Sequence, residues 1–353
     1  MNTKKLLLSL GVPAVLGSTL LTGCGQPNNQ AATNSTAPVA EAPENSTAEK
    51  GGETGAMKAR SDATKLAFSS APRTLPVGKA ATWTIKITDS KSGEAVKDFA
   101  VVHDKLMHLI VVSKDLSWFN HIHPTHKGNG VFTVSAKLPH GGAYKLYADY
   151  TPQGGGNEVA QHELSLDGIS PIGAKLVPDK MQGAWMKKKV TAHVEGEPNA
   201  KGGATYEVAL MPMPTPLLAG QDTMLHFQVR DAKSQPIKDL QPYLGAMGHC
   251  VILSQDTTKY LHSHPMEGGM NAAGGMDHDM SKMGEMKSAT PPKSGGPDVM
   301  FHTNFPTAGL YKTWGQFMHK GKIITAAFVV NVGAAKAGAA NDAAHGESQP
   351  HAH

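Results

Sequence analysis

The sequence predicts an all-β protein built from two tandem immunoglobulin-like or cupredoxin-like antiparallel β-sandwiches. Residues 82–88 alternate apolar and polar side chains with a period of two, which is typical of a half-buried strand. Clusters rich in Gly, Pro, Asp and Ser interrupt the chain at short intervals, and no amphipathic helix of convincing length is present. The same succession of segments occurs twice, and about 100 residues of short strands per copy is typical of a sandwich.

The composition excludes one class of partner and draws attention to another. The 353 residues are enough for two ordinary domains, and 33 Lys and Arg against 29 Asp and Glu give a net charge of only +4. This bias is too small for a nucleic-acid binder. The unusual counts are 18 His and 17 Met, because both side chains bind metals and neither is needed in such numbers to build a core.

Residues 1–23 are predicted to be a lipoprotein signal peptide. Two lysines precede an apolar run over residues 6–21, which is too short for a confident membrane span. The run ends in Leu-Thr-Gly-Cys24, which resembles the lipobox of bacterial lipoproteins. We therefore expect lipidation of Cys24 and a membrane anchor in the cell envelope, facing the periplasm or the cell exterior. Cys250 is then the remaining cysteine, so no intramolecular disulfide is expected.

Three segments are predicted to lie outside the sandwiches. Residues 24–60 are polar and poor in large apolar side chains, so we expect a disordered tether. Residues 334–353 are expected to be a disordered tail with histidines, by the same reasoning. Residues 169–204 are rich in Pro, Gly and Lys and are expected to be a linker, with one strand over 189–194 that belongs to either domain.

The internal repeat defines the two domains, residues 61–168 and residues 205–333. Four segments recur in order: 77–89 as 219–231, 107–113 as 248–254, 119–124 as 260–265, and 138–147 as 305–314. Residues 109–112 are continuously apolar, which predicts a strand buried on both faces.

The first copy carries a candidate metal site of three histidines. His121 and His123 are two residues apart and therefore project from the same face of a strand, and His108 lies on the preceding strand. If residues 113–118 form the hairpin loop, residue 108 lies opposite residue 123 within about one position, where facing Cβ atoms are about 4.5 to 5.5 Å apart. Three imidazoles can then converge on one point.

The second copy repeats this arrangement with His249, His262 and His264 at the same spacing. We expect one site in each half of the chain, because imidazole nitrogen binds copper and zinc well at about 2.0 Å. His103 and His302 are candidate fourth ligands of the first and second sites. The alternative interpretation is that these histidines only form hydrogen bonds within each sandwich.

An insertion over residues 265–298 of the second copy is the second metal signal. Its candidate ligands, on a Gly-rich backbone, are Met266, Met270, Met276, His278, Met280, Met283 and Met286. Soft thioethers favour Cu(I). Methionines also build adaptable hydrophobic surfaces, but no Leu, Ile or Phe accompanies these. We expect a copper-binding loop.

Cys250 is not expected to belong to a blue-copper site. It directly follows His249, so its side chain points to the opposite face of the strand, and its counterpart in the first copy is Leu109. We expect a buried, small, apolar side chain.

Several motifs resemble exported bacterial proteins of the YtkA-like kind, which are related in fold to CopC-like copper-resistance proteins. The motifs lie at residues 243–249, 261–265, 301–306 and 309–317, and the resemblance covers about residues 66–168 and 205–333. It implies a periplasmic sandwich associated with copper and heavy-metal efflux. The first copy lacks the Met-rich insertion and the Phe-His-x-x-Phe-Pro element, so equal metal affinity of the two domains is not implied.

The leading hypothesis is a lipid-anchored copper-binding protein that acts as a chaperone or buffer and meets a metal-efflux or copper-handling protein. The expected ion is Cu(I) or Cu(II), and zinc is a further candidate. Two alternatives stay open. One is a metal-dependent enzyme with a three-histidine site, although no general base or substrate pocket is apparent and we expect no enzymatic activity. The other is a duplicated interaction module with structural histidines.

Overall fold

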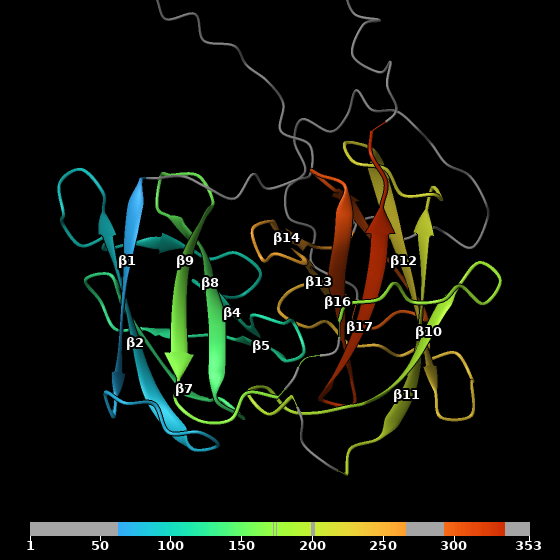
Figure 1. The fold of residues 1–353 in the computed structure, drawn as a ribbon, viewed down its shortest axis with the longest axis horizontal. Coiled ribbons are helices and arrows are strands. Elements are labelled where there is room, and N and C mark those ends of the chain that lie inside the picture. Colours follow the sequence, from blue (N-terminus) through green and yellow to red (C-terminus); the bar gives the residue numbers. More distant parts are fainter. Residues whose placement is uncertain (1–62, 172, 174, 199–201, 266–292, 336–353) are drawn as a thin grey trace, which may run out of the picture. The chain divides into compact units, whose positions relative to one another are not determined.

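A computed structural model describes residues 63–171, 173, 175–198, 202–265 and 293–335. The predicted signal peptide with Cys24, the tether, most of the Met-rich insertion and most of the tail lie outside the described residues. The described part is all-β, as predicted, and is drawn from blue to red in Figure 1. Within those ranges no helix has the length and apolar character that a membrane crossing requires.

The first sandwich is formed by two antiparallel sheets. One sheet has the order β1 (Thr64–Ala71), β2 (Ala80–Asp89), β7 (Val131–Lys137), β6 (Thr125–His126). The other has the order β3 (Phe99–Ala100), β8 (Gly142–Pro152), β4 (His108–Ser113), β5 (Phe119–Ile122), with β9 (Glu158–Leu166) also paired to β8.

The second sandwich repeats this plan. One sheet has the order β10 (Met186–Thr191), β11 (Thr205–Met213), β12 (Asp222–Asp231), β15 (Asp298–Asn304). The other has the order β14 (Tyr260–Ser263), β13 (His249–Ser254), β16 (Gly309–His319), β17 (Lys322–Val332). The strand expected over residues 189–194 of the linker is β10, which begins and ends three residues earlier and pairs with β11. This part of the predicted linker therefore belongs to the second sandwich.

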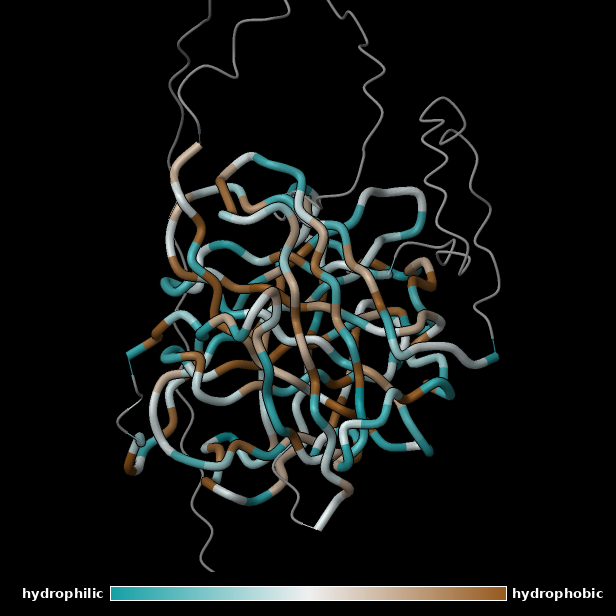
Figure 2. The backbone as a smooth tube through the Cα atoms, turned by 90° about the vertical axis from the view of Figure 1, so that its right-hand side faces the viewer, coloured by the Kyte–Doolittle hydropathy of each residue, from teal (hydrophilic) through white to brown (hydrophobic). Residues whose placement is uncertain are grey.

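Each sandwich has its own core, because alternate residues of its strands point inward. In β2 the inward residues Trp83, Ile85 and Ile87 are fully or almost fully buried and pack in one cluster with Leu109 and Val111 of the opposite sheet. The second core is built in the same way around the side chains of Phe227, Phe301, Phe317 and Phe328. Figure 2 shows the alternation of hydrophobic and hydrophilic residues along the strands.

A third apolar cluster joins the two sandwiches. It contains Ile110 and Val112 of β4 together with Val251 and Leu253 of β13. These residues alternate along their strands with the residues that fill the two cores, and every residue of β4 and β13 is buried. The prediction of a strand buried on both faces is therefore confirmed. One face of β4 packs on its own core, and the other packs against the second sandwich.

Equivalent aromatic residues of the two repeats stack on each other across this contact. Phe119 stacks on Trp314 with ring centroids 4.7 Å apart, and Tyr147 stacks on Tyr260 at 4.9 Å. Phe119 is the first residue of β5, and Tyr260 is the first residue of the equivalent strand β14. Their partners are also equivalent: Trp314 of β16 lies opposite Val251, and Tyr147 of β8 lies opposite Ile110. The contact is therefore reciprocal, like the isologous interface of a twofold-symmetric dimer.

Two lysines at equivalent positions also bridge the sandwiches in a reciprocal way. Lys145 Nζ donates to the carbonyl oxygen of Thr257 at 2.8 Å, and Lys312 Nζ donates to that of Leu116 at 2.7 Å. Leu116 and Thr257 occupy the same place in the two hairpin loops, each with a positive φ of 58° or 59°. The loop carbonyls are thus hydrogen-bonded by the opposite sandwich.

Candidate metal centre

The hairpin β4–β5 positions the first histidine triad as the sequence predicts. Leu109 pairs with Ile122 and Ile110 with His121, so His108 lies opposite His123. Ile122 packs in the core of its own sandwich, and His121 therefore projects from the other face of the strand. The equivalent hairpin β13–β14 pairs Cys250 with Ser263 and Val251 with His262, which reproduces the arrangement in the second repeat.

The first triad has the spacing of metal ligands. His108 Nδ1 lies 3.1 Å from His121 Nε2, and His121 Nε2 lies 3.2 Å from His123 Nε2. One nitrogen of each ring lies within 4.8 Å of those of the other two. Bonds of about 2.0 Å at tetrahedral angles separate ligand nitrogens by about 3.3 Å. The three inner nitrogens are therefore as close as a shared tetrahedral ion would hold them.

The outer nitrogens fix the tautomer of each ring. Each donates to an oxygen atom: His108 Nε2 to Val102 O at 3.1 Å, His121 Nδ1 to Gln316 Oε1 at 2.7 Å, and His123 Nδ1 to Glu195 Oε1 at 2.7 Å. The amide nitrogen of Gln316 donates to Thr325 at 3.1 Å, which leaves its oxygen for His121. A neutral imidazole with its proton on the outer nitrogen presents a lone pair at the inner one.

Three lone pairs at this distance repel one another unless a positive charge lies between them. A proton is a poor candidate for this charge. Burial lowers the pKa of His108 to about 3 and that of His121 well below its ordinary value, and it also lowers the pKa of His123. A metal cation satisfies the three nitrogens without protonating any ring. The donor set therefore fits metal binding better than a purely structural triad.

The second triad has the same design. His249 Nδ1 lies 3.3 Å from His262 Nε2, and His249 Nε2 donates to the carbonyl oxygen of Tyr243 at 2.9 Å. His262 Nδ1 donates to Asp149 at 3.0 Å. The Nε2 atom of His264 is buried and has no hydrogen-bond partner among the described residues. Such a buried, unsatisfied nitrogen is costly in a protein interior, and a bound cation would satisfy it.

The two triads are neighbours, which the sequence did not predict. The ring centroid of His262 lies 5.3 Å from that of His108 and 5.6 Å from that of His121. The ring of His249 lies 5.9 Å from each of the same two rings. Distances between rings of one triad are only slightly shorter, from 4.6 to 5.5 Å. Six imidazoles thus form one cluster where the sandwiches meet.

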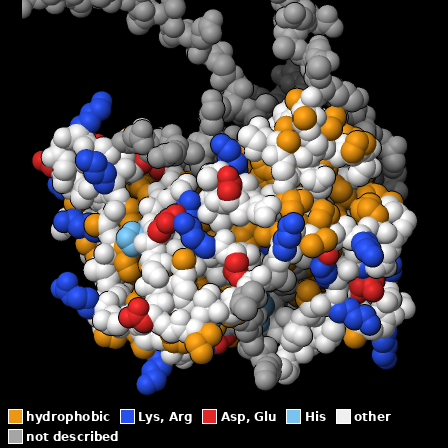
Figure 3. All heavy atoms as spheres, in the orientation of Figure 1, with side chains coloured by type: hydrophobic (Ala, Val, Ile, Leu, Met, Phe, Trp, Pro, Cys, Tyr) orange, Lys and Arg blue, Asp and Glu red, His pale blue; other side chains and the backbone are white. Residues whose placement is uncertain are grey.

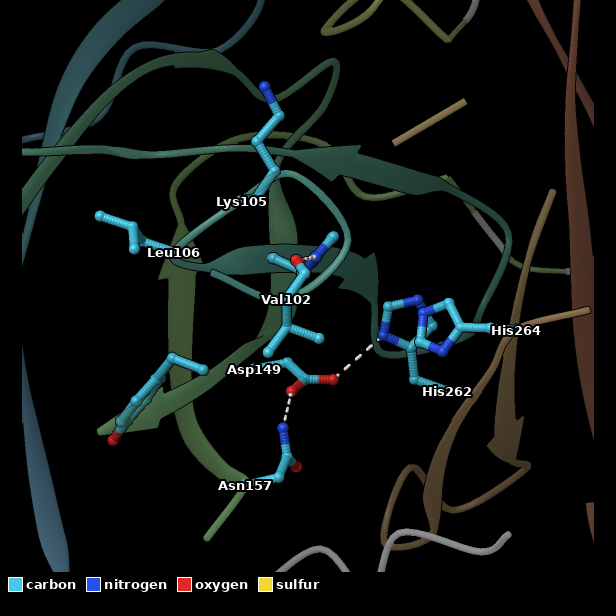
Figure 4. A pocket seen from close by; sticks show the side chains of 9 residues that line it. Val102, Lys105, Leu106, Asp149, Asn157, His262 and His264 are labelled. Atoms are coloured by element: carbon cyan, nitrogen blue, oxygen red, sulfur yellow. Dashed lines mark hydrogen bonds and ion pairs between the residues drawn. The ribbon is translucent and has the colours of Figure 1, made fainter. Parts of the chain in front are cut away.

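Asp149 places a buried negative charge beside this cluster. Its carboxylate accepts hydrogen bonds from His262, from Asn157 at 2.8 Å and from the Tyr260 hydroxyl at 3.1 Å, and the first two are drawn in Figure 4. Burial alone raises the pKa of Asp149, but the hydrogen bonds from His262 and Asn157 hold it below its usual value. The ionised carboxylate, only 4% exposed, favours a cation nearby.

The cavity at this place is ion-sized. It has a volume of about 10 Å³ and is lined by residues that include His108, Asp149, His262 and His264. This is about the space of one water molecule.

Few histidine side chains are visible on the face of the molecule drawn in Figure 3. On that face, Lys and Arg are interspersed with Asp and Glu.

His103 does not lie where the sequence placed it. Instead of joining the first triad, its ring stacks on that of His264 with centroids 3.4 Å apart and 19° between planes, and it also meets His249 edge-on at 5.7 Å. The cause is the tight turn between Val102 and Lys105, in which His103 has a φ of 47°. A residue of the first repeat therefore contacts the triad of the second.

His302 is directed away from the second triad, so its prediction as a fourth ligand is wrong. It lies on β15, opposite Met224 of β12, in the sheet that does not contain β13 or β14. Its neighbour Phe301 fills the core, so His302 projects to the outer face, where it lies 3.5 Å from Asp222. The candidate ligands Met266, Met270, Met276, His278, Met280, Met283 and Met286 lie outside the described residues.

Cys250 is a buried core residue, as predicted. Its side chain packs in the core of the second sandwich, on the opposite face of β13 from His249, with Sγ 3.1 Å from Thr313 Oγ1. Burial raises the pKa of the thiol to about 12, so the thiol stays protonated at neutral pH.

Three supporting residues were missed from the sequence: Asp149, Gln316 and Glu195. Asp149 and Gln316 each lie in the buried middle part of a strand, opposite His108 and His249. A polar residue in the middle of such a strand was the available signal. Glu195 lies in the loop between β10 and β11 of the second sandwich, and no pattern there marked it.

The fold and the cluster define a tandem β-sandwich protein with a buried six-histidine centre. The chain belongs to the family described as Domain of unknown function (DUF8832), whose model matches residues 59–167 and 200–334, more than half of the chain. Among curated proteins, none matches this chain.

Solved structures of β-rich proteins are only distantly similar. FdeC, an Escherichia coli adhesin, is 14% identical with a TM-score of 0.21, and the match covers 76% of this chain and 63% of that one. A Salmonella α-2-macroglobulin mutant is 9% identical with a TM-score of 0.21, covering 79% and 15%. Carbohydrate-binding modules of the β-sandwich superfamily are 12% identical with a TM-score of 0.19, covering 76% and 98%. Similarity at this level does not bear on function.

Proposed function

We propose that this protein is a lipid-anchored metal-binding protein of the cell envelope, which binds copper through its two histidine triads and acts as a copper chaperone or buffer. One observation carries the proposal. In the first triad the outer nitrogens of His108, His121 and His123 all donate to oxygen atoms, so three lone pairs point at one buried spot. This is the usual outer hydrogen bonding of metal-binding histidines.

Copper is preferred to zinc because of the sequence of the Met-rich insertion. Imidazole alone suits both metals, but the thioethers of the insertion over residues 265–298 favour Cu(I). The resemblance to YtkA-like and CopC-like proteins supports the same choice. The lipobox motif ending in Cys24 supports the anchor, and a metal-efflux or copper-handling protein is the expected partner.

Binding is favoured over catalysis because the histidines are buried and the site offers little room for a substrate. His108, His121, His249 and His262 are each at most 8% exposed, and the adjoining cavity holds about one water. A three-histidine enzyme needs an open coordination position that a substrate can reach. A structural role for the triads would need a proton on an inner nitrogen, which burial disfavours.

The test is anaerobic titration of the mature chain with Cu(I), Cu(II) and Zn(II). We expect one Cu(I) ion per triad, loss of one ion in His121→Ala/His123→Ala, and loss of the other in His262→Ala/His264→Ala. The matched control is His226→Ala/His302→Ala, which removes two histidines of β12 and β15, in the sheet without triad residues, and should leave both ions bound. Deletion of residues 266–292 should slow or weaken Cu(I) uptake.

Two other results would contradict the proposal. Absence of stoichiometric binding of any of the three ions would favour the interaction module with structural histidines. Metal-dependent turnover of a substrate, abolished by the same substitutions, would favour the enzyme.

A further inference from the structure

We propose that the two triads form one coupled centre in which each sandwich sets the metal affinity of the other sandwich's triad, through Asp149 acting on His262 and Gln316 acting on His121. This inference rests on the proposed function, because it concerns the same histidines. It adds two positioning residues and the direction in which each acts.

The supporting contacts cross between the sandwiches in both directions. Asp149 of β8 accepts a hydrogen bond from His262 of the second repeat at 3.0 Å, and Gln316 of β16 accepts one from His121 of the first repeat at 2.7 Å. Neither residue supports a histidine of its own sandwich in this way. Asp149 is 4% exposed and Gln316 is 2% exposed, so both contacts are shielded from water.

The two positions are structural equivalents. Asp149 lies opposite His108 in the pairing of β4 with β8, and Gln316 lies opposite His249 in the pairing of β13 with β16. The histidines that they contact, His262 and His121, are also equivalent. The crossing therefore follows from the reciprocal contact of the sandwiches and occurs twice.

The two positions differ in charge, so Asp149 and Gln316 should differ in how strongly each raises the metal affinity of the triad that it contacts. A carboxylate that accepts from the outer nitrogen of a histidine raises the basicity of the inner nitrogen and strengthens its bond to a metal. A neutral amide orients the ring with a weaker effect. Asp149 should therefore strengthen metal binding at the triad of His249, His262 and His264, and a carboxylate in place of Gln316 should strengthen binding at the other triad.

The experiment uses full-length chains that retain a single triad. His121→Ala/His123→Ala keeps the second triad, and His262→Ala/His264→Ala keeps the first. Asp149→Asn and Gln316→Glu are introduced into each background, and Cu(I) affinity is measured against a chromophoric competing chelator, with Zn(II) as a second probe. Thermal unfolding of each metal-free chain reports on folding.

The expected result is a crossed pattern. Asp149→Asn should weaken binding about 10- to 100-fold in the chain that keeps the second triad and far less in the other. Gln316→Glu should strengthen binding in the chain that keeps the first triad, a gain that misfolding cannot produce. Lys312→Met, which removes an interface hydrogen bond to Leu116 elsewhere, should lower the unfolding temperature without this selectivity.

The outcomes separate the inference from the proposed function. If each single-triad chain binds one ion but the substitutions act on the triad of their own sandwich, or equally on both triads, the crossed coupling is wrong and copper binding stands. If neither chain binds Cu(I) or Zn(II), the proposed function fails and the coupling fails with it.

Discussion

At the residue scale, the hairpin loops that present the triads are held by one carboxylate each. Asp256 Oδ1 accepts hydrogen bonds from Ser254 Oγ, from the Thr258 backbone at 3.0 Å and from Thr258 Oγ1 at 2.9 Å. Asp115 is bonded in the same way to Ser113 and Ser117. Such turns satisfy the loop's own backbone and so fix where the following strand begins.

These hydrogen bonds make the stability of the loops depend on pH. The bond from Ser254, and then those from Thr258, lower the pKa of Asp256 below 3.8. A carboxyl whose folded pKa is depressed contributes stability above its unfolded pKa, and this contribution is lost as the pH falls through the folded value. Asp256→Asn should therefore cost about 1 kcal/mol at pH 7, because the turn keeps only a neutral acceptor.

The measurement is urea unfolding of the wild type and Asp256→Asn from pH 7 to pH 2.5. The difference between the two should begin to shrink as the pH falls below about 3.9, where the unfolded chain takes up a proton, and should be lost as the pH falls through the lower pKa of the folded carboxyl. A difference that stayed constant over this range would show that the charge of Asp256 has no part in holding the turn.

The individual histidines could be predicted, but their partners could not. His121 and His123 were identifiable because a spacing of two places both on one strand face, whatever the rest of the fold. The position of His103 depends on a tight turn, and that of His302 depends on the pairing of β15 with β12. Local sequence patterns determine neither. The contacts of Asp149 and Gln316 depend on the packing of two domains and leave no local trace beyond a polar residue in the middle of a strand.

At the element scale, β4 and β13 each contribute to the core of their own sandwich and to the contact between the sandwiches. Their inward residues hold a core, their outward residues hold the other sandwich, and the histidine at the start of each strand lies on the outward side. The continuous apolar run of residues 109–112 predicted burial on both faces. It could not show that the second covering layer was the other repeat, because an apolar face specifies burial but not the partner.

A charge on the outward face of β13 should separate the sandwiches without unfolding them. Val251 is fully buried in the cluster between the sandwiches, and an aspartate there would be buried without a partner. We expect Val251→Asp to weaken metal binding at both triads while far-ultraviolet circular dichroism still reports β structure. Leu261→Asp, in the core of the second sandwich, should instead unfold that sandwich.

Proteolysis distinguishes these two effects. In Val251→Asp, cleavage should occur in the connection between the sandwiches and leave two resistant fragments, whereas Leu261→Asp should leave only the first. Unchanged metal binding in Val251→Asp would show that the triads do not need the contact.

At the scale of the whole molecule, metal binding should act as a clamp between the repeats. An ion that binds only the folded, docked chain stabilises it by about 4 kcal/mol at a thousandfold excess over its dissociation constant. The hydrogen bonds of Asp149 and Gln316 cross between the sandwiches, so this stabilisation should extend to both. Calorimetry should show one shared unfolding transition at a higher temperature with Cu(I), and chelation should reverse the shift.

Two separate transitions, of which only one moves with Cu(I), would contradict this expectation. The control is the chain that lacks both triads, His121→Ala/His123→Ala/His262→Ala/His264→Ala, whose unfolding temperature should not respond to copper. The all-β class and the two repeats followed from periodicity and internal similarity alone. The docking of the repeats did not, because it depends on the fit of two whole faces.

Joining two equivalent sandwiches in one polypeptide allows the paired positions to differ. A homodimer built from a single such sandwich would carry the same side chain at the positions of Asp149 and Gln316, and its two triads would then have the same metal affinity. Here one place holds a carboxylate and the other an amide, in Asp149 and Gln316. If the triads bind metal as proposed, the covalent connection allows the two triads to differ in affinity, and we expect them to fill and empty in a set order.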